Sequence, residues 1–121
     1  MRSLYLEVMR DAIKTLTIDF KMKQNELNCA LCGINTLNYH QYHVDHKTKP
    51  FVIIANQFIN ENSEIMPTLF KNNITHGGHV FSENDKELEQ KWYDYHLQHS
   101  DFQILCNSCN SKKGTKLNYI N

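Results

Sequence analysis

The sequence predicts a small α+β protein. Apolar residues recur at helical spacing in some segments and form short runs of strand length in others. Two Cys-x-x-Cys pairs stand far apart in a chain of 121 residues, a length that fits one domain with a modest core. We therefore predict a single domain in which an N-terminal helix, residues 1–26, packs on a core formed by residues 27–121.

The charge balance limits how this protein could bind a polyanion such as nucleic acid. Lys and Arg number 13, as do Asp and Glu, so the formal net charge is zero and any grip on nucleic acid must be local. The mean hydropathy of −0.58 suits a globular protein, and no stretch approaches the ~20 apolar residues that span a membrane. Charged residues interrupt positions 1–11 before an apolar run of signal-peptide length forms, so we expect an intracellular protein.

The N-terminal segment has the period of an amphipathic helix. Its apolar residues fall at steps of three and four: Leu4, Val8, Met9, Ile13, Leu16 and Phe20. Packing on the core is the expected role of this helix, and docking of a protein partner is the alternative.

Turn residues and apolar runs divide the next part of the chain. Gly33, directly after Cys32, permits the tight turn of a metal-binding knuckle. Tyr39–Asp45 has the pattern of a strand, which ends before Pro50. The apolar run 51–59 has the length of a buried helix.

The second half begins with residues 60–81, which lack a clear period and predict a long irregular excursion. Ser82 could cap a helix over residues 84–99, which has acidic residues in its first turn. Residues 102–105 form a predicted short strand. Residues 106–117 begin with a second knuckle and continue as a short predicted helix.

Both Cys-x-x-Cys pairs are predicted zinc ligands. In a reducing compartment, Cys29 with Cys32 and Cys106 with Cys109 supply the four thiolates of a closed tetrahedral site. Because the pairs lie far apart, the ion would tie two distant parts of the chain together. Free buried cysteines and a redox-active pair are the alternatives, although two matched pairs fit a thioredoxin-like arrangement poorly.

A second cluster of chemically useful residues lies at the end of the predicted strand, between the knuckles. Neighbouring side chains on a strand face opposite ways, so Asp45 could hold a hard cation while His46 faces a water. His43 shares the face of Asp45, and it either joins the same site or is an ordinary surface or core histidine.

Together these segments resemble the HNH endonucleases, which have a ββα-metal core. The shared pieces are Cys29-x-x-Cys32, Asp45-His46 followed by a proline, and Leu105-Cys106-Asn107-Ser108-Cys109-Asn110-Ser111-Lys112. The resemblance covers roughly residues 27–116. It implies an α+β fold with a small ββα-metal core, a four-cysteine zinc staple, the added N-terminal helix and a second long helix.

The resemblance also implies a metal-dependent endonuclease that hydrolyses phosphodiester bonds, with double-stranded DNA as its partner. His46 would be the general base, and Asp45 and Asn110 would bind a catalytic Mg²⁺ or Mn²⁺. The zinc ion would be structural, and it would help to place Asn110 because that residue follows Cys109. Small stand-alone proteins of this family are frequent in phages and mobile elements, which is the setting we expect.

One position departs from the family pattern. Where family members have an asparagine that braces the loop carrying the histidine, this sequence has Asp101. Aspartate accepts hydrogen bonds but cannot donate them as an amide can. Either the brace differs, therefore, or Asn107 or His99 takes its place.

Five lysines flank the motif segments and could form a basic rim around the active centre: Lys47, Lys49, Lys112, Lys113 and Lys116. Contact with phosphate is the functional interpretation, and simple solvation is the alternative. For the whole chain, the rival to an enzyme is a non-catalytic zinc-knuckle module that binds nucleic acid or protein. Such a module would need neither the Asp-His pair nor Asn110.

Overall fold

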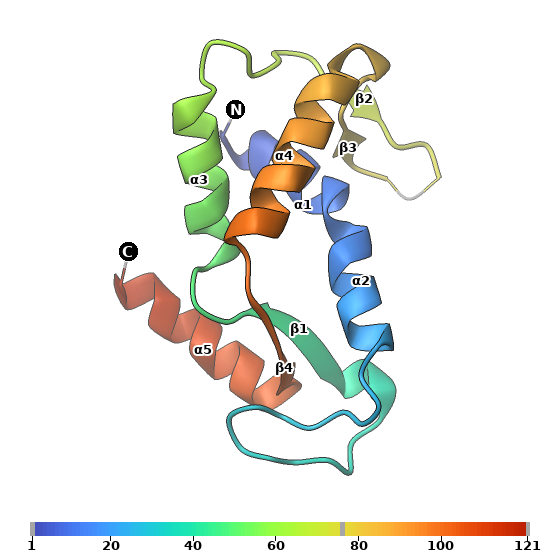
Figure 1. Cartoon of the computed structure of the whole chain (residues 1–121), viewed down its shortest axis with the longest axis vertical. Coiled ribbons are helices and arrows are strands. Elements are labelled where there is room, and N and C mark those ends of the chain that lie inside the picture. Colours follow the sequence, from blue (N-terminus) through green and yellow to red (C-terminus); the bar gives the residue numbers. More distant parts are fainter. Residues whose placement is uncertain (1, 76, 121) are drawn as a thin grey trace. The chain divides into compact units, whose positions relative to one another are not determined.

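A computed structural model describes residues 2–75 and 77–120 of the chain, with the backbone alone for residues 2, 3 and 115–120. This described part is α+β, as predicted, with five α-helices and two two-stranded antiparallel sheets. The helices are α1 (Arg2–Ala12), α2 (Lys14–Met22), α3 (Phe51–Glu61), α4 (Lys86–His99) and α5 (Asn107–Ile120). The strands, labelled with the helices in Figure 1, are β1 (Tyr42–His46), β2 (Lys71–Asn72), β3 (His79–Val80) and β4 (Phe102–Cys106).

The chain divides into two compact units, each built from two separate stretches of sequence. Unit 1 consists of the residues up to Leu16 together with Phe51–Ser100. Unit 2 consists of Thr17–Pro50 together with the residues from Asp101 onward. The single domain expected from the sequence stays a prediction. Among the described residues, no helix combines the length and the apolar character needed to span a membrane.

The N-terminal segment forms two helices, not the one predicted over residues 1–26. Ile13 separates them: its N–H bonds to the Arg10 carbonyl, and its own carbonyl receives the Leu16 N–H. These three-residue steps interrupt the four-residue ladder of an α-helix. α2 then ends at Met22, because the polar run that follows offers no apolar face to bury.

Unit 1 buries apolar faces of α1, α3 and α4 in a common core. The buried helix predicted over residues 51–59 is confirmed as α3, and the helix predicted over residues 84–99 is confirmed as α4. Trp92 on α4 is fully buried and donates its indole N–H to the Met9 carbonyl at 2.8 Å. This bond ties α4 to α1 inside the core.

The excursion predicted over residues 60–81 contains one short hairpin, in which β2 pairs with β3. A carboxylate oxygen of Glu7 on α1 accepts the backbone N–H of His79 at 2.9 Å and lies 3.0 Å from the ring nitrogen Nδ1. These contacts attach the hairpin to α1. α3 extends to Glu61, and apart from that end of the helix and the hairpin, the described residues of the excursion are irregular, as predicted.

Unit 2 contains the antiparallel pair β1 and β4, in a register that sets Tyr42 opposite Cys106 and His46 opposite Phe102. The predicted strand begins later than expected, because Tyr39–Gln41 form a 3-10 turn. α5 follows β4 without an intervening loop and contacts β1 (Figure 1). Two strands and a helix therefore pack together in unit 2, which also contains both cysteine pairs.

Candidate functional site

The first knuckle is shaped by a glycine turn. Gly33 has a φ of 80°, a left-handed conformation that favours glycine, and its N–H donates to the Cys29 carbonyl at 2.9 Å. The Cys32 N–H donates to the Cys29 sulfur at 3.5 Å. The turn therefore brings the two sulfurs of this pair together.

The second knuckle joins β4 to α5. β4 ends with Cys106, and the Cys109 N–H in the first turn of α5 donates to the Cys106 sulfur at 3.4 Å. A backbone bond of 2.8 Å from the Ala30 N–H to the Ile104 carbonyl fastens the first knuckle to β4. The two knuckles thus meet although their cysteines lie at distant positions in the sequence.

The four cysteine sulfurs form one cluster in which all of them lie within 4.8 Å of one another. The sulfurs of Cys32 and Cys106 are 3.8 Å apart. Four sulfurs about 2.3 Å from a tetrahedral zinc ion would be separated by about 3.8 Å, so donor type, number and spacing all fit. The prediction that these cysteines form one site able to hold a metal, with zinc the best match, is confirmed.

The protonation of the thiols is uneven across the cluster. Burial raises the pKa of Cys29, but hydrogen bonds from the backbone of Cys106, Cys32 and Leu31 outweigh it and lower the pKa to about 6. Hydrogen bonding with the Cys106 sulfur raises the pKa of Cys109 to about 12. The backbone donors around Cys29 therefore favour its thiolate, the form that binds a soft cation.

The carboxylate of Asp45 is held by β4 and α5. Gln103, its cross-strand partner, donates its side-chain amide to Asp45 Oδ2 at 2.9 Å. Lys113 on α5 donates its ammonium group to the same oxygen, and to the backbone carbonyls of His46 and Lys47 at 2.9 and 3.1 Å. The Asp45 and Lys113 side chains are only 13% and 19% exposed, so this is a partly buried ion pair.

His46 faces the other side of the strand pair, as alternation along a strand requires. Its ring packs edge-on against Phe102, its cross-strand partner, with ring centroids 5.1 Å apart. Phe102 in turn contacts Phe20 of α2, with centroids 5.5 Å apart. Asp45 and His46 thus have different surroundings, as the sequence predicts for strand neighbours. His43, two residues before Asp45, is exposed.

Asp101 fastens the loop after β1 to the start of β4. Its backbone carbonyl accepts the Lys47 N–H at 2.6 Å, and its carboxylate accepts the Thr48 hydroxyl at 3.0 Å. Both donors come from the loop, so Asp101 acts only as an acceptor in these contacts. Asn107 instead accepts the neighbouring Ser108 N–H with its side-chain oxygen at 2.9 Å.

Asn110 lies in the first turn of α5, directly after Cys109, and is partly buried. Residues three positions apart share a helix face, so Asn110 is on the side of α5 from which Lys113 reaches Asp45. Binding of one cation by Asp45 and Asn110 together stays a prediction.

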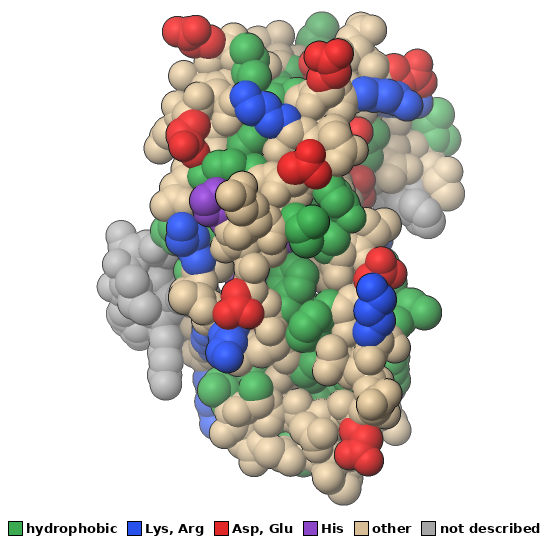
Figure 2. Space-filling view, viewed as in Figure 1, with side chains coloured by type: hydrophobic (Ala, Val, Ile, Leu, Met, Phe, Trp, Pro, Cys, Tyr) green, Lys and Arg blue, Asp and Glu red, His purple; other side chains and the backbone are tan. Residues whose placement is uncertain are grey.

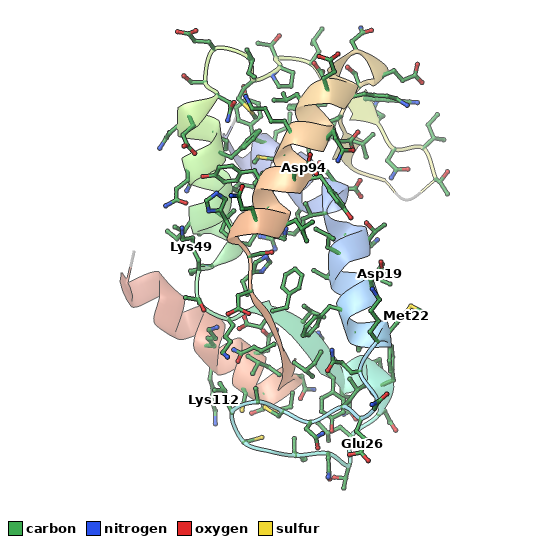
Figure 3. The ribbon with its side chains drawn as sticks, in the orientation of Figure 1. Asp19, Met22, Glu26, Lys49, Asp94 and Lys112 are labelled. Carbon is green, nitrogen blue, oxygen red and sulfur yellow. The ribbon has the colours of Figure 1, made fainter. Side chains whose placement is uncertain are left out.

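The lysines predicted to form a basic rim differ in their surroundings. Lys47 and Lys112 are exposed and Lys49 is partly buried; the Lys112 side chain extends from α5 in Figure 3. Lys113 is engaged in its ion pair, and the side chain of Lys116 lies outside the described residues. Basic side chains stand among acidic ones in both units on the face shown in Figure 2. Contact of the lysines with phosphate stays a prediction.

Comparison with known proteins finds no matching family model, curated protein or solved structure. The chemistry of unit 2 therefore has to be inferred from its own residues. The geometry adds two residues that the sequence does not single out, Gln103 and Thr48, which hold Asp45 and Asp101. The sequence predicts two strands that could pair, and this pairing could have indicated Gln103 and Thr48. The register of the pair, which decides the contacts, cannot be read from the sequence.

Proposed function

We propose that unit 2 is a metal-dependent endonuclease of the HNH type that hydrolyses phosphodiester bonds in DNA. The observation that carries the proposal is the position of Asp45 and His46 at the end of β1, beside a strand that runs directly into α5. Two antiparallel strands followed by a helix, with Asn110 in the first helical turn, support a ββα-metal core. Both Asp45 and His46 are partly exposed, as residues that meet a substrate must be.

In the proposed nuclease, the cysteine cluster would bind a structural zinc ion. Cys106 and Cys109 flank the junction between β4 and α5, so an ion held there would fix how α5 leaves the strand. Asn110 follows Cys109 directly and would be oriented by the same ion.

We assign Asp45 and Asn110 to a second, hard cation. Carboxylate and amide oxygens are ligands that Mg²⁺ and Mn²⁺ accept, and water and phosphate oxygens would complete the coordination. When bound, the cation would stabilise charge on the phosphate and on the leaving oxygen. The amide of Gln103 already donates to Asp45, which orients the carboxylate.

We assign His46 as the general base, because a neutral imidazole can take the proton from a water that attacks phosphorus. The edge-on contact with Phe102 restricts the orientation of its ring. The bonds from Lys47 and Thr48 to Asp101 hold the loop that follows it. The position of His46 is thus supported by the ring contact with Phe102 and by the bonds that hold the following loop.

One observation favours a second candidate, a non-catalytic zinc module that binds nucleic acid or protein. Lys113 already pairs with Asp45, and a permanent ion pair would leave no carboxylate for a cation. The protein would then bind its partner without a chemical step.

Plasmid cleavage separates the two candidates. The zinc-loaded full chain is incubated with supercoiled plasmid and Mg²⁺ or Mn²⁺, or with neither cation added. Nicking that depends on the added cation is the expected result. A shift of the plasmid in a gel without any cleavage would favour the binding module.

The His46→Ala substitution should abolish detectable nicking, because the loss of a general base lowers the rate by roughly 10²–10⁴-fold. Zinc content and circular dichroism should stay unchanged. The matched control is His40→Ala, since His40 is exposed in the 3-10 turn ahead of β1 and has no assigned role. Full nicking activity in His46→Ala would contradict its assignment.

A further inference from the structure

The ammonium group of Lys113 lies in a cradle made only of oxygen atoms. Its three N–H donors meet three acceptors: the Asp45 carboxylate and the backbone carbonyls of His46 and Lys47. The Lys113 side chain is 19% exposed, so most of it is withdrawn from water. A flexible surface lysine would not satisfy all three donors in this way.

Carboxylate and carbonyl oxygens are also the ligands that hard divalent cations take. A divalent cation bound to Asp45 and the ammonium of Lys113 would be two positive charges in contact with one carboxylate. Their repulsion at such separations in a partly buried site is large. The two positive charges therefore oppose each other at Asp45, and binding of one weakens binding of the other.

α5, the helix that carries Lys113, is fixed near its N-terminal end. Cys109 lies one helical turn before Lys113 and belongs to the sulfur cluster. The backbone of α5 is thus anchored, and a change of partner at Asp45 requires only rotation of the lysine side chain. Lys112, the next residue back, is exposed and presents its charge elsewhere.

We infer that Lys113 is an intramolecular competitor of the divalent cation at Asp45. The inference rests on the proposed function in one respect, the assignment of Asp45 as a cation ligand. In the free protein the ammonium occupies the carboxylate and keeps cation affinity low. A phosphate of the nucleic acid offers Lys113 another anion, so substrate and divalent cation bind cooperatively.

Binding of Mn²⁺ to the zinc-loaded full chain, without nucleic acid, tests the inference. Free Mn²⁺ is followed by electron paramagnetic resonance for the wild type, Lys113→Met and Lys112→Met. Lys113→Met should bind Mn²⁺ at least about tenfold more tightly than the wild type, the change expected when a charged hydrogen-bonding competitor is removed. Lys112→Met removes the same charge from the neighbouring position and should bind like the wild type.

Two further variants separate competition from misfolding. Lys113→Gln keeps donors for the two carbonyls but has no charge, so it should also bind Mn²⁺ more tightly. Adding Asp45→Asn to Lys113→Met should remove the gain. Equal or weaker binding in both Lys113 variants, or no binding in any protein, would overturn the inference.

The outcomes for this inference and for the proposed function can be told apart, because the titration contains no substrate. Tighter Mn²⁺ binding in Lys113→Met, with no cleavage by any variant, would support the competitor and reject the nuclease. Metal-dependent cleavage by the wild type, with unchanged Mn²⁺ affinity in Lys113→Met, would support the nuclease and reject the competitor.

Discussion

At the scale of single residues, the contact between Thr48 and Asp101 ties the loop after β1 to the start of β4. Aspartate cannot donate, yet the loop after β1 supplies a backbone N–H and a hydroxyl that both point to Asp101. The stability of this corner therefore depends on a hydroxyl at position 48.

The Thr48→Val substitution should lower the free energy of unfolding by about 0.5–1 kcal/mol, because valine keeps the shape of threonine and removes the donor. The value lies at the low end of the range for one hydrogen bond because the Thr48–Asp101 pair is exposed. Urea unfolding followed by circular dichroism measures the change. Thr48→Ser keeps the hydroxyl and should stay near the wild type, so equal losses in both variants would refute a role for the bond.

The ligand types at the candidate site could be predicted, but most of their partners could not. The cysteines were predictable because each pair is local in the sequence. The contacts of Asp45 join it to Gln103 and Lys113, which lie 58 and 68 positions away. Such contacts depend on strand register and on the direction of α5, and no local pattern encodes either.

At the scale of elements, the first knuckle depends on a backbone conformation that favours glycine. Gly33→Ala should weaken zinc binding by roughly tenfold, because the left-handed conformation costs a residue with a Cβ about 1–2 kcal/mol. The cost is purely conformational, since a Cβ at Gly33 would meet no atom within 4 Å. Competition with a chromogenic chelator measures the zinc affinity.

Gly114→Ala provides the matched control for this substitution. Gly114 lies within α5, and a Cβ there also meets no atom within 4 Å. Alanine is the better helix former, so this variant should keep its zinc affinity and be slightly more stable. Similar weakening in both variants would mean that the conformation of Gly33 is not what matters.

The elements with a clear period were predictable, whereas the break in the N-terminal segment was not. One apolar pattern runs through α1 and α2, and it predicts a continuous helix. The structure divides that pattern between two cores: Val8, Met9 and Ile13 are buried in unit 1, while Phe20 contacts Phe102 in unit 2. Local periodicity cannot reveal which core a residue joins.

At the scale of the whole molecule, the chain leaves unit 2 after β1 and returns to it at β4. The stretch between, Phe51–Ser100, forms the larger part of unit 1. Sequence alone could not predict this division, because it follows from the pairing of two strands that are distant in the chain. Among the described residues, each unit has its own buried cluster, and the cluster of unit 2 includes Cys29 and Cys106 of the four-cysteine site, with Cys109 packed against it.

Removal of zinc should therefore loosen unit 2 before unit 1. The buried cluster of unit 2 is small, with Cys29, Leu105 and Cys106 at its centre, so a metal staple would supply much of its stability. Trp92 is the only tryptophan of the chain and is fully buried in unit 1, so its emission reports on unit 1. After chelation, the backbone amides of β1 and β4 should exchange rapidly with deuterium while the Trp92 emission stays unchanged. Protection retained in both strands would exclude a structural role for the metal, and a simultaneous change at Trp92 would mean that the units unfold together.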